Sequence, residues 1–121
     1  MRVVIDTNIL IDFLSGADAA NEELARHDEP CISPISWMEV MVGAEDVSEE
    51  RRLRAFLTQF ERVPIDHEVA EIAVGIRKTT RIRLPDAIIW ATAKRIDGVL
   101  VTRNTRDFPV QDPGIRVPYS L

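Results

Sequence analysis

The sequence has few of the features that mark a disulfide-stabilised or membrane-spanning protein. Cys31 is the only cysteine among 121 residues, so no disulfide can form within the chain. The apolar runs are well short of the ~18 residues that a transmembrane helix requires, and no charged-then-apolar leader precedes the first predicted strand. We therefore expect a cytoplasmic protein that does not enter a membrane, with Cys31 as a small buried apolar residue.

Positive charge is also scarce, and the formal net charge is −5. Proteins that coat nucleic acid without sequence preference are usually basic, so this class is disfavoured. The charge is unevenly divided, however: residues 1–74 carry 16 acidic and 6 basic side chains, whereas residues 75–106 carry 8 basic and 2 acidic ones. One basic segment on an acidic protein can bind a phosphate backbone on one face, although basic helices are often only solvated.

The length and composition indicate one α/β domain over residues 1–121, with 45% apolar and 29% charged residues. Continuous β-branched runs predict buried strands at 3–5 and 99–102, and shorter strands are expected near 31–33, 63–65 and 114–117. Helical patterns lie between them, near 9–14, 19–27, 36–44, 48–60, 67–78 and 84–95. Strands that alternate with helices predict a mainly parallel sheet covered by helices on both faces.

Five polar residues stand out against this apolar background. Asp6 ends the first strand, and Glu39 is the only charge in a helix so apolar that we expect it to be buried all round. Asp86 lies in the first turn of another apolar helix, and Asn104 and Asp107 follow the strand at 99–102. The carboxyl ends of parallel strands share one edge of the sheet, so Asp6 and the loop with Asn104 and Asp107 can meet there.

A convergence of these carboxylates implies a metal ion. Buried carboxylates repel one another and are costly unless they are paired or bind a cation. Ligands that are all oxygen suit Mg²⁺ or Mn²⁺ better than Zn²⁺. His27 and His67 are far apart in the chain, lack zinc-site spacing, and are expected on the surface.

Each carboxylate also has a purely local interpretation. Asp6 can cap the helix that follows it, and Glu39 can complete a capping box with Ser36. Asp86 can offset a helix dipole, and Asp107 can be an ordinary loop residue. Local capping explains poorly why all of them lie beside the most apolar segments.

Four segments of the chain resemble the motifs of the PIN-domain family, in the family's order and spacing. They are Val4-Ile5-Asp6-Thr7-Asn8, Ser36-Trp37-Met38-Glu39-Val40, the segment from Leu84 to Ala93, and the segment from Leu100 to Phe108. The chain length is similar to that of VapC-type toxins of toxin–antitoxin pairs. The resemblance implies a three-layer α/β/α fold with a mainly parallel sheet of four or five strands.

The resemblance also implies a function and a set of site residues. It predicts an endoribonuclease that depends on Mg²⁺ or Mn²⁺ and leaves a 5′ phosphate, with Asp6, Glu39 and Asp86 as its core acidic residues. Many relatives carry Asp where this chain has Asn104, so Asn104, Asp107 or both can supply the fourth position. Polar neighbours that orient the site are Thr7, Asn8 and Thr102. Candidate contacts to RNA are Arg77, Lys78, Arg81, Arg83, Arg103 and Arg106.

VapC-like proteins usually form homodimers, inhibit translation, and are neutralised by a small DNA-binding VapB-like antitoxin. We expect the same partners here, with apolar helix faces around Ile11 and Leu14, or around Phe56, Leu57 and Phe60, as candidate contacts. Two alternatives differ in class. A PIN-like domain that binds protein or RNA without cutting is compatible with Asn104. A receiver-like or dehalogenase-like phosphotransfer domain is disfavoured, because the segment Asp6-Thr7-Asn8 contains no second Asp, no adjacent acidic pair is present there, and no Lys follows the strand at 99–102.

Overall fold

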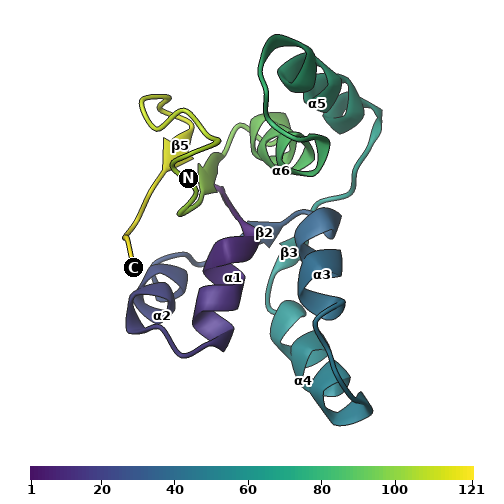
Figure 1. Ribbon diagram of the computed structural model, residues 1–121, viewed down its shortest axis with the longest axis vertical. Coiled ribbons are helices and arrows are strands. Elements are labelled where there is room, and N and C mark those ends of the chain that lie inside the picture. Colours follow the sequence, from purple (N-terminus) through teal and green to yellow (C-terminus); the bar gives the residue numbers. More distant parts are fainter.

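The β-branched run near the start of the chain forms β1 (Val3–Ile5), the central strand of a five-stranded sheet in the computed structural model, which describes residues 1–121 (Figure 1). The strand order is β3-β2-β1-β4-β5, and every pair of neighbours is parallel. The predicted parallel sheet is therefore confirmed. The other strands are β2 (Cys31–Ile32), β3 (Glu61–Arg62), β4 (Val99–Val101) and β5 (Ile115–Arg116).

Helices cover both faces of this sheet and make three layers (Figure 1). Val4 of β1 packs into the core beneath α5 and α6, whereas its neighbours Val3 and Ile5 pack into the core beneath α1 and α4. This alternation is the period-two pattern of a strand that is buried on both faces. One layer contains α1 (Thr7–Leu14), α2 (Asp18–Ala25), α3 (Pro34–Met41) and α4 (Val47–Leu57), and the other contains α5 (His67–Thr79) and α6 (Leu84–Arg95).

The order of the strands places a change of direction between β1 and β4. The chain proceeds outward from β1 to β2 and β3, then returns to the other side of β1 to form β4 and β5. Val3, Val4 and Ile5 pair with Val99, Leu100 and Val101. In open α/β sheets, sites form outside the carboxyl ends of the strands at such a switch point. Asp6 and Thr102 follow the two strands that meet there.

Helix α3 differs from the prediction in its cap and in its burial. Its N-cap is Ser33, whose hydroxyl accepts a hydrogen bond from the Ile35 amide at 3.1 Å. The capping box between Ser36 and Glu39, which is the local interpretation of Glu39, does not form, and Ser36 is fully buried inside the helix. Only one face of α3 packs against other elements, so Met38, 48% exposed, faces solvent together with Glu39.

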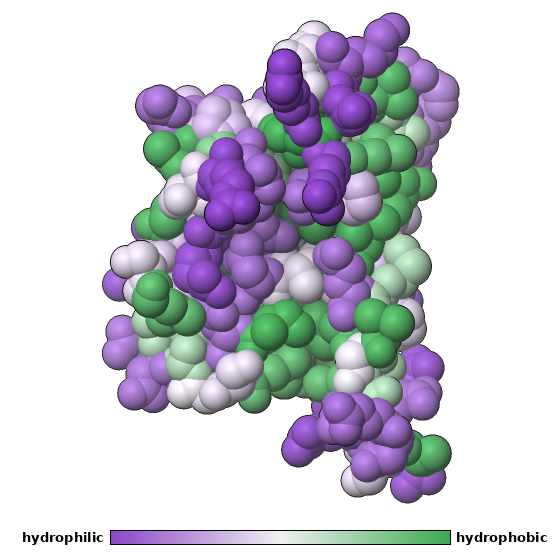
Figure 2. Space-filling view, viewed as in Figure 1, coloured by the Kyte–Doolittle hydropathy of each residue, from purple (hydrophilic) through white to green (hydrophobic).

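Hydrophobic surface lies between α1 and α4 on the face shown in Figure 2, beside hydrophilic side chains. The apolar residues Ile11 and Leu14 of α1 are 43% and 37% exposed. A cavity of about 440 Å³ on this surface is lined by residues of α1, α3 and α4. None of the helices has the length and apolar character needed to cross a membrane.

Two further differences concern β3 and the start of β4. The edge strand lies at Glu61–Arg62, before the predicted 63–65, because Pro64 has no amide hydrogen to continue the ladder beyond Val63. At Gly98, a Cβ atom would lie 2.7 Å from the Arg2 carbonyl oxygen, so only glycine lets β4 begin this close to β1. Cys31 is buried, as predicted.

Candidate functional site

Asp6 is a nearly buried carboxylate at the carboxyl end of β1. It is the N-cap of α1, and its Oδ1 accepts a hydrogen bond from the Thr7 amide at 2.7 Å. The side chain is therefore a cap, as the local interpretation holds, but this bond uses only one of its two oxygens. Asp6 is 4% exposed, and burial raises its pKa to about 6, with further contributions from the negative charges of Asp86 and Glu39.

The second oxygen of Asp6 is held by residues at the end of β4 and the start of α1. The Thr102 hydroxyl donates to Asp6 Oδ2 at 2.7 Å, and Asn8 Nδ2 donates to the same atom at 3.2 Å. Asn8 Oδ1 accepts from the Arg103 amide at 3.1 Å. Thr102 and Asn8 therefore hold the Asp6 carboxylate in position through these two hydrogen bonds.

Glu39 is held by Thr7. The Thr7 hydroxyl lies 2.6 Å from Glu39 Oε1 and 2.9 Å from Ser36 Oγ. A hydroxyl has one hydrogen to donate, so when Thr7 donates to Glu39 it accepts from Ser36. This relay orients Glu39, an exposed residue of α3, toward the start of α1, and it accounts for the burial of Ser36.

Asp86 is half-buried in the first turn of α6. Burial raises its pKa, and the negative charges of Glu39 and Asp107 raise it further, whereas Arg83 opposes this shift. Asp6 is likewise affected by Asp86. Asp86 therefore lies close enough to Asp6, Glu39 and Asp107 for mutual repulsion, and Asp6 lies close enough to Glu39.

Asn104 and Asp107 belong to one compact turn after β4. Asn104 Oδ1 accepts hydrogen bonds from the amides of Arg106 and Asp107, and its Nδ2 donates to Asp107 Oδ2 at 3.0 Å. Asn104 lines the cavity described below, whereas Asp107 is exposed and is not among the lining residues. The two candidates for the fourth acidic position thus belong to one turn, and the Asn104 side chain holds that turn together.

A cavity of about 360 Å³ connects these groups at the carboxyl edge of the sheet. Its lining consists of Asp6, Thr7, Asn8, Ile11, Asp12, Glu39, Asp86, Arg103 and Asn104. No three acidic, histidine or cysteine side chains form a closed ligand set around one point. The carboxylates instead surround an open space, and their oxygen-only donors and mutual repulsion fit a hard cation that keeps several water ligands.

Comparison with known proteins identifies the family. The PIN-domain family profile matches residues 3–112. The chain belongs to the PIN-domain family. This confirms the resemblance of the four motifs, and the PIN domain spans nearly the whole sequence.

The PIN domain is similar to proteins of toxin–antitoxin pairs over its full length. Ribonuclease VapC10 of Mycobacterium tuberculosis is 34% identical over 127 residues, which cover 98% of this chain and 94% of the relative. A chain of a toxin–antitoxin complex from Klebsiella pneumoniae matches with a TM-score of 0.92 and 43% identity, covering 98% of this chain and 99% of that one. A chain of DNA-bound VapBC from Salmonella typhimurium matches with a TM-score of 0.75 and 29% identity, covering 96% of both.

The basic residues predicted to contact RNA divide into two groups in this PIN domain. Five are exposed, at the end of α5, in the α5–α6 connection and in the turn after β4: Arg77, Lys78, Arg81, Arg83 and Arg106. Arg103 is different, because its Nε and one terminal nitrogen donate to Asp12 at 2.7 and 2.9 Å. Its side chain is 34% exposed and lines the carboxylate cavity.

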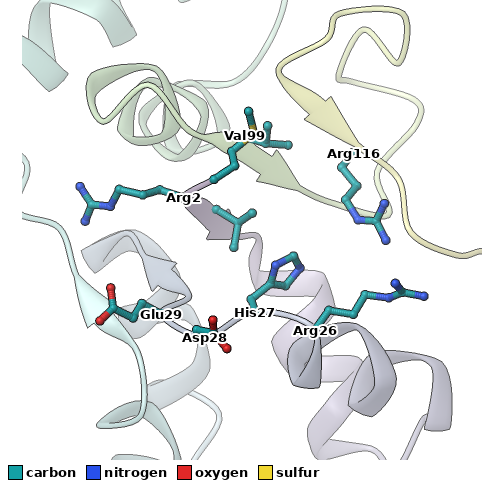
Figure 3. A pocket seen from close by; sticks show the side chains of 9 residues that line it. Arg2, Arg26, His27, Asp28, Glu29, Val99 and Arg116 are labelled. Atoms are coloured by element: carbon teal, nitrogen blue, oxygen red, sulfur yellow. The ribbon is translucent and has the colours of Figure 1, made fainter.

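A larger cavity, of about 680 Å³, lies at the opposite edge of the sheet, beside Val3 and Val99 (Figure 3). Arg2 points away from the other basic groups. Arg26 and Arg116 both form ion pairs with the buried Glu23, so they already have an acidic partner within the protein. His27, predicted on the surface, is only 17% exposed because its Nε2 is hydrogen bonded to the buried Glu23 at 2.9 Å.

Sequence reasoning missed two residues of the carboxylate cavity or its wall. Asp12 is a single charge within an apolar helix, the same signal that identified Glu39, so it could have been found. Tyr119, whose hydroxyl donates to Asp12 Oδ2 at 2.7 Å, had no such signal, because it lies in an irregular segment beyond the last strand.

Proposed function

We propose that this PIN domain is a Mg²⁺- or Mn²⁺-dependent endoribonuclease that hydrolyses RNA phosphodiester bonds, and that it is the toxin of a VapBC-type pair that inhibits translation in the cytoplasm. One observation carries the proposal. Asp6, Glu39 and Asp86 come from three separate elements and line one open cavity, where the charges of Glu39 and Asp86 raise the pKa of Asp6. Sequence similarity to proteins named ribonuclease VapC supports the substrate class.

The residues of the chain have distinct tasks in this mechanism. Asp6, Glu39 and Asp86 would hold the metal ion, with Asn104 or Asp107 completing its ligands. When bound, the ion supplies Lewis-acid stabilisation of phosphate charge and lowers the pKa of water. Thr102 and Asn8 hold Asp6 in position, and the Thr102 hydrogen bond lowers the pKa of Asp6 against the effect of burial. Thr7 fixes Glu39.

The exposed basic residues complete the substrate side of the proposal. Arg77, Lys78, Arg81, Arg83 and Arg106 offer exposed positive charge, and Arg83 lies close enough to Asp86 to lower its pKa. Local positive charge of this kind is compatible with a net charge of −5. Phosphate contacts of this kind give affinity without sequence preference. Specific recognition of RNA usually targets unpaired loops, so we expect a single-stranded target.

We further propose a VapB-like antitoxin and a second copy of the chain as protein partners. Solved structures similar to this chain at 43% and 29% identity are described as a toxin–antitoxin complex and as DNA-bound VapBC. The hydrophobic surface between α1 and α4, with Ile11 and Leu14 exposed, offers apolar area for such a contact (Figure 2).

The test is cleavage of a fluorescent RNA with Mg²⁺ or Mn²⁺ and with EDTA, using the wild-type protein, Asp6→Asn and Asp97→Asn. Asp97 is exposed and precedes β4 at the other edge of the sheet, so its variant is a matched control. We expect Asp6→Asn to lose more than about 100-fold in rate, since even partners outside the ligand set of a metal site cost 10–100-fold.

Two outcomes would contradict the nuclease. Equal cleavage by wild type and Asp6→Asn would identify a contaminating enzyme. RNA binding without cleavage under any metal condition would favour the alternative, a PIN-like domain that acts as a binding module.

A further inference from the structure

Asp12 is a buried carboxylate with three hydrogen-bond donors and no place in the proposed ligand set. It is 6% exposed and accepts two bonds from Arg103 and one from Tyr119. The Arg103 hydrogen bond lowers the pKa of Asp12, so the carboxylate is ionised at neutral pH. These three hydrogen bonds connect Asp12 of α1 with Arg103, just after β4, and with Tyr119 in the C-terminal segment.

The Arg103 guanidinium lies in the wall of a cavity that also contains Asp6, Glu39 and Asp86. Three clustered carboxylates attract any mobile cation within a few ångströms. A released arginine in this wall would therefore pair with them, and its planar fork suits carboxylates well. Arg103 instead makes its two parallel bonds to Asp12, and its backbone amide is held by Asn8.

Stability alone does not explain the cluster. Buried ion pairs rarely stabilise a fold more than well-packed apolar residues of the same size. Tyr119, which is 107 positions away in the chain, adds a third hydrogen bond to Asp12. Both facts favour a role in fixing where the guanidinium points.

We propose that Asp12 and Tyr119 are positioning residues that hold Arg103 away from Asp6, Glu39 and Asp86, which keeps these carboxylates free for a divalent cation. The inference rests on the proposed function, because it assumes that the carboxylates bind a metal. Arg103 keeps three N–H groups that Asp12 does not use, and these remain available to a substrate phosphate from the cavity side.

The test is Mn²⁺ binding to the whole chain without RNA, measured by calorimetry and by the electron paramagnetic resonance signal of free Mn²⁺. We expect Asp12→Asn to weaken binding about tenfold, since a nearby opposite charge shifts carboxylate equilibria by about 1–3 pKa units. The double variant Asp12→Asn/Arg103→Gln should bind as tightly as Arg103→Gln alone. Tyr119→Phe, which leaves both Arg103 bonds in place, should weaken binding only slightly.

A second pair of variants keeps Asp12 intact if Asp12→Asn does not fold. Arg103→Lys retains the charge but cannot make two parallel bonds to one carboxylate. Arg103→Lys should bind Mn²⁺ more weakly than Arg103→Gln. Circular dichroism checks that both variants are folded.

The outcomes separate the two proposals. If wild type binds Mn²⁺ but Asp12→Asn binds equally well, or if the double variant is as weak as Asp12→Asn, the positioning role is wrong and the nuclease stands. If the wild-type protein binds no Mn²⁺, the proposed metal-dependent nuclease is wrong, and the positioning role that rests on it is wrong as well.

Discussion

The Thr102 hydroxyl donates a hydrogen bond of 2.7 Å to Asp6 Oδ2, and it joins two residues that are 96 positions apart in the chain. Both side chains are buried, at the ends of the two strands that flank the switch point. Burial raises the pKa of Asp6, and this hydrogen bond lowers it, so the pair decides at which pH the carboxylate is charged.

The first prediction concerns the pH dependence of metal binding. Asp6 has a pKa of about 6, so it is protonated below that pH and ionised above it. The increase in Tm caused by Mn²⁺ should therefore be small near pH 5 and grow as the pH rises through about 6. Thr102→Val removes a bond that lowers the pKa, so its transition should lie at higher pH. Thr92→Val, another buried threonine, is the control, and coincident curves for Thr102→Val and wild type would contradict the prediction.

The second prediction separates the hydroxyl of Thr7 from its methyl group. Thr7→Val keeps the shape of the side chain but removes the donor to Glu39 Oε1. We expect RNA cleavage to fall about 10–100-fold, the usual cost of losing a partner that orients a metal ligand. Thr7→Ser keeps the hydroxyl and should remain close to wild type. A large loss in Thr7→Ser would mean that packing of the methyl group matters instead.

The third prediction tests the fourth acidic position. Asp107→Asn removes a charge that raises the pKa of Asp86, so the pKa of Asp86 should fall. Mn²⁺ affinity should fall as well, because the site loses a negative charge. Asp97→Asn is an exposed control at a position with a φ of 52°, which asparagine tolerates. Unchanged Mn²⁺ affinity in Asp107→Asn would leave Asn104 as the only contributor from this turn.

The fourth prediction concerns the exposed basic residues. Arg77→Gln/Arg81→Gln/Arg83→Gln should weaken RNA binding in EDTA, and the dependence of log K on log[salt] should become less steep by about 0.7 for each RNA phosphate that the variant no longer neutralises. Arg51→Gln/Arg52→Gln removes two exposed charges from α4 as a control. If both variants bind RNA with the same affinity at every salt concentration, RNA contacts a different part of the surface.

The fifth prediction compares two glycines. Gly98→Ala places a Cβ atom 2.7 Å from the Arg2 carbonyl oxygen, whereas a Cβ atom at Gly75 of α5 meets nothing within 4 Å. Gly98→Ala should lower the free energy of unfolding by about 1–3 kcal/mol, the usual cost of forced overpacking. Gly75→Ala should raise it by roughly 0.5–1 kcal/mol because alanine favours the helix. Urea unfolding of both variants measures the difference, and equal stabilities would exclude a close approach at Gly98.

Local sequence signals predicted the elements that carry the site. The β-branched runs gave β1 and β4, and the positions of Asp6, Glu39 and Asp86 beside apolar segments predicted that they would meet. These signals succeed because strand and helix periodicity act within a few residues. The parallel order of the strands then brings their ends together.

The errors have a different physical origin. Composition alone could not show which face of α3 is covered, because that depends on where α1 and α6 pack. Arg103 is hydrogen bonded to Asp12, which is 91 positions away in the chain, and Tyr119 is hydrogen bonded to the same carboxylate. No local sequence pattern encodes such a pairing. Long-range hydrogen bonds of this kind follow from the order of the strands, which the sequence pattern left open.

The pairing of β1 with β4 has a consequence for synthesis of the chain. Asp6 and Glu39 leave the ribosome before Thr102, Asn104 and Asp107 have been made. Strand β1 has no β4 to pair with until then. A nascent polypeptide therefore has no assembled cavity until β4 and the turn that follows it have been made.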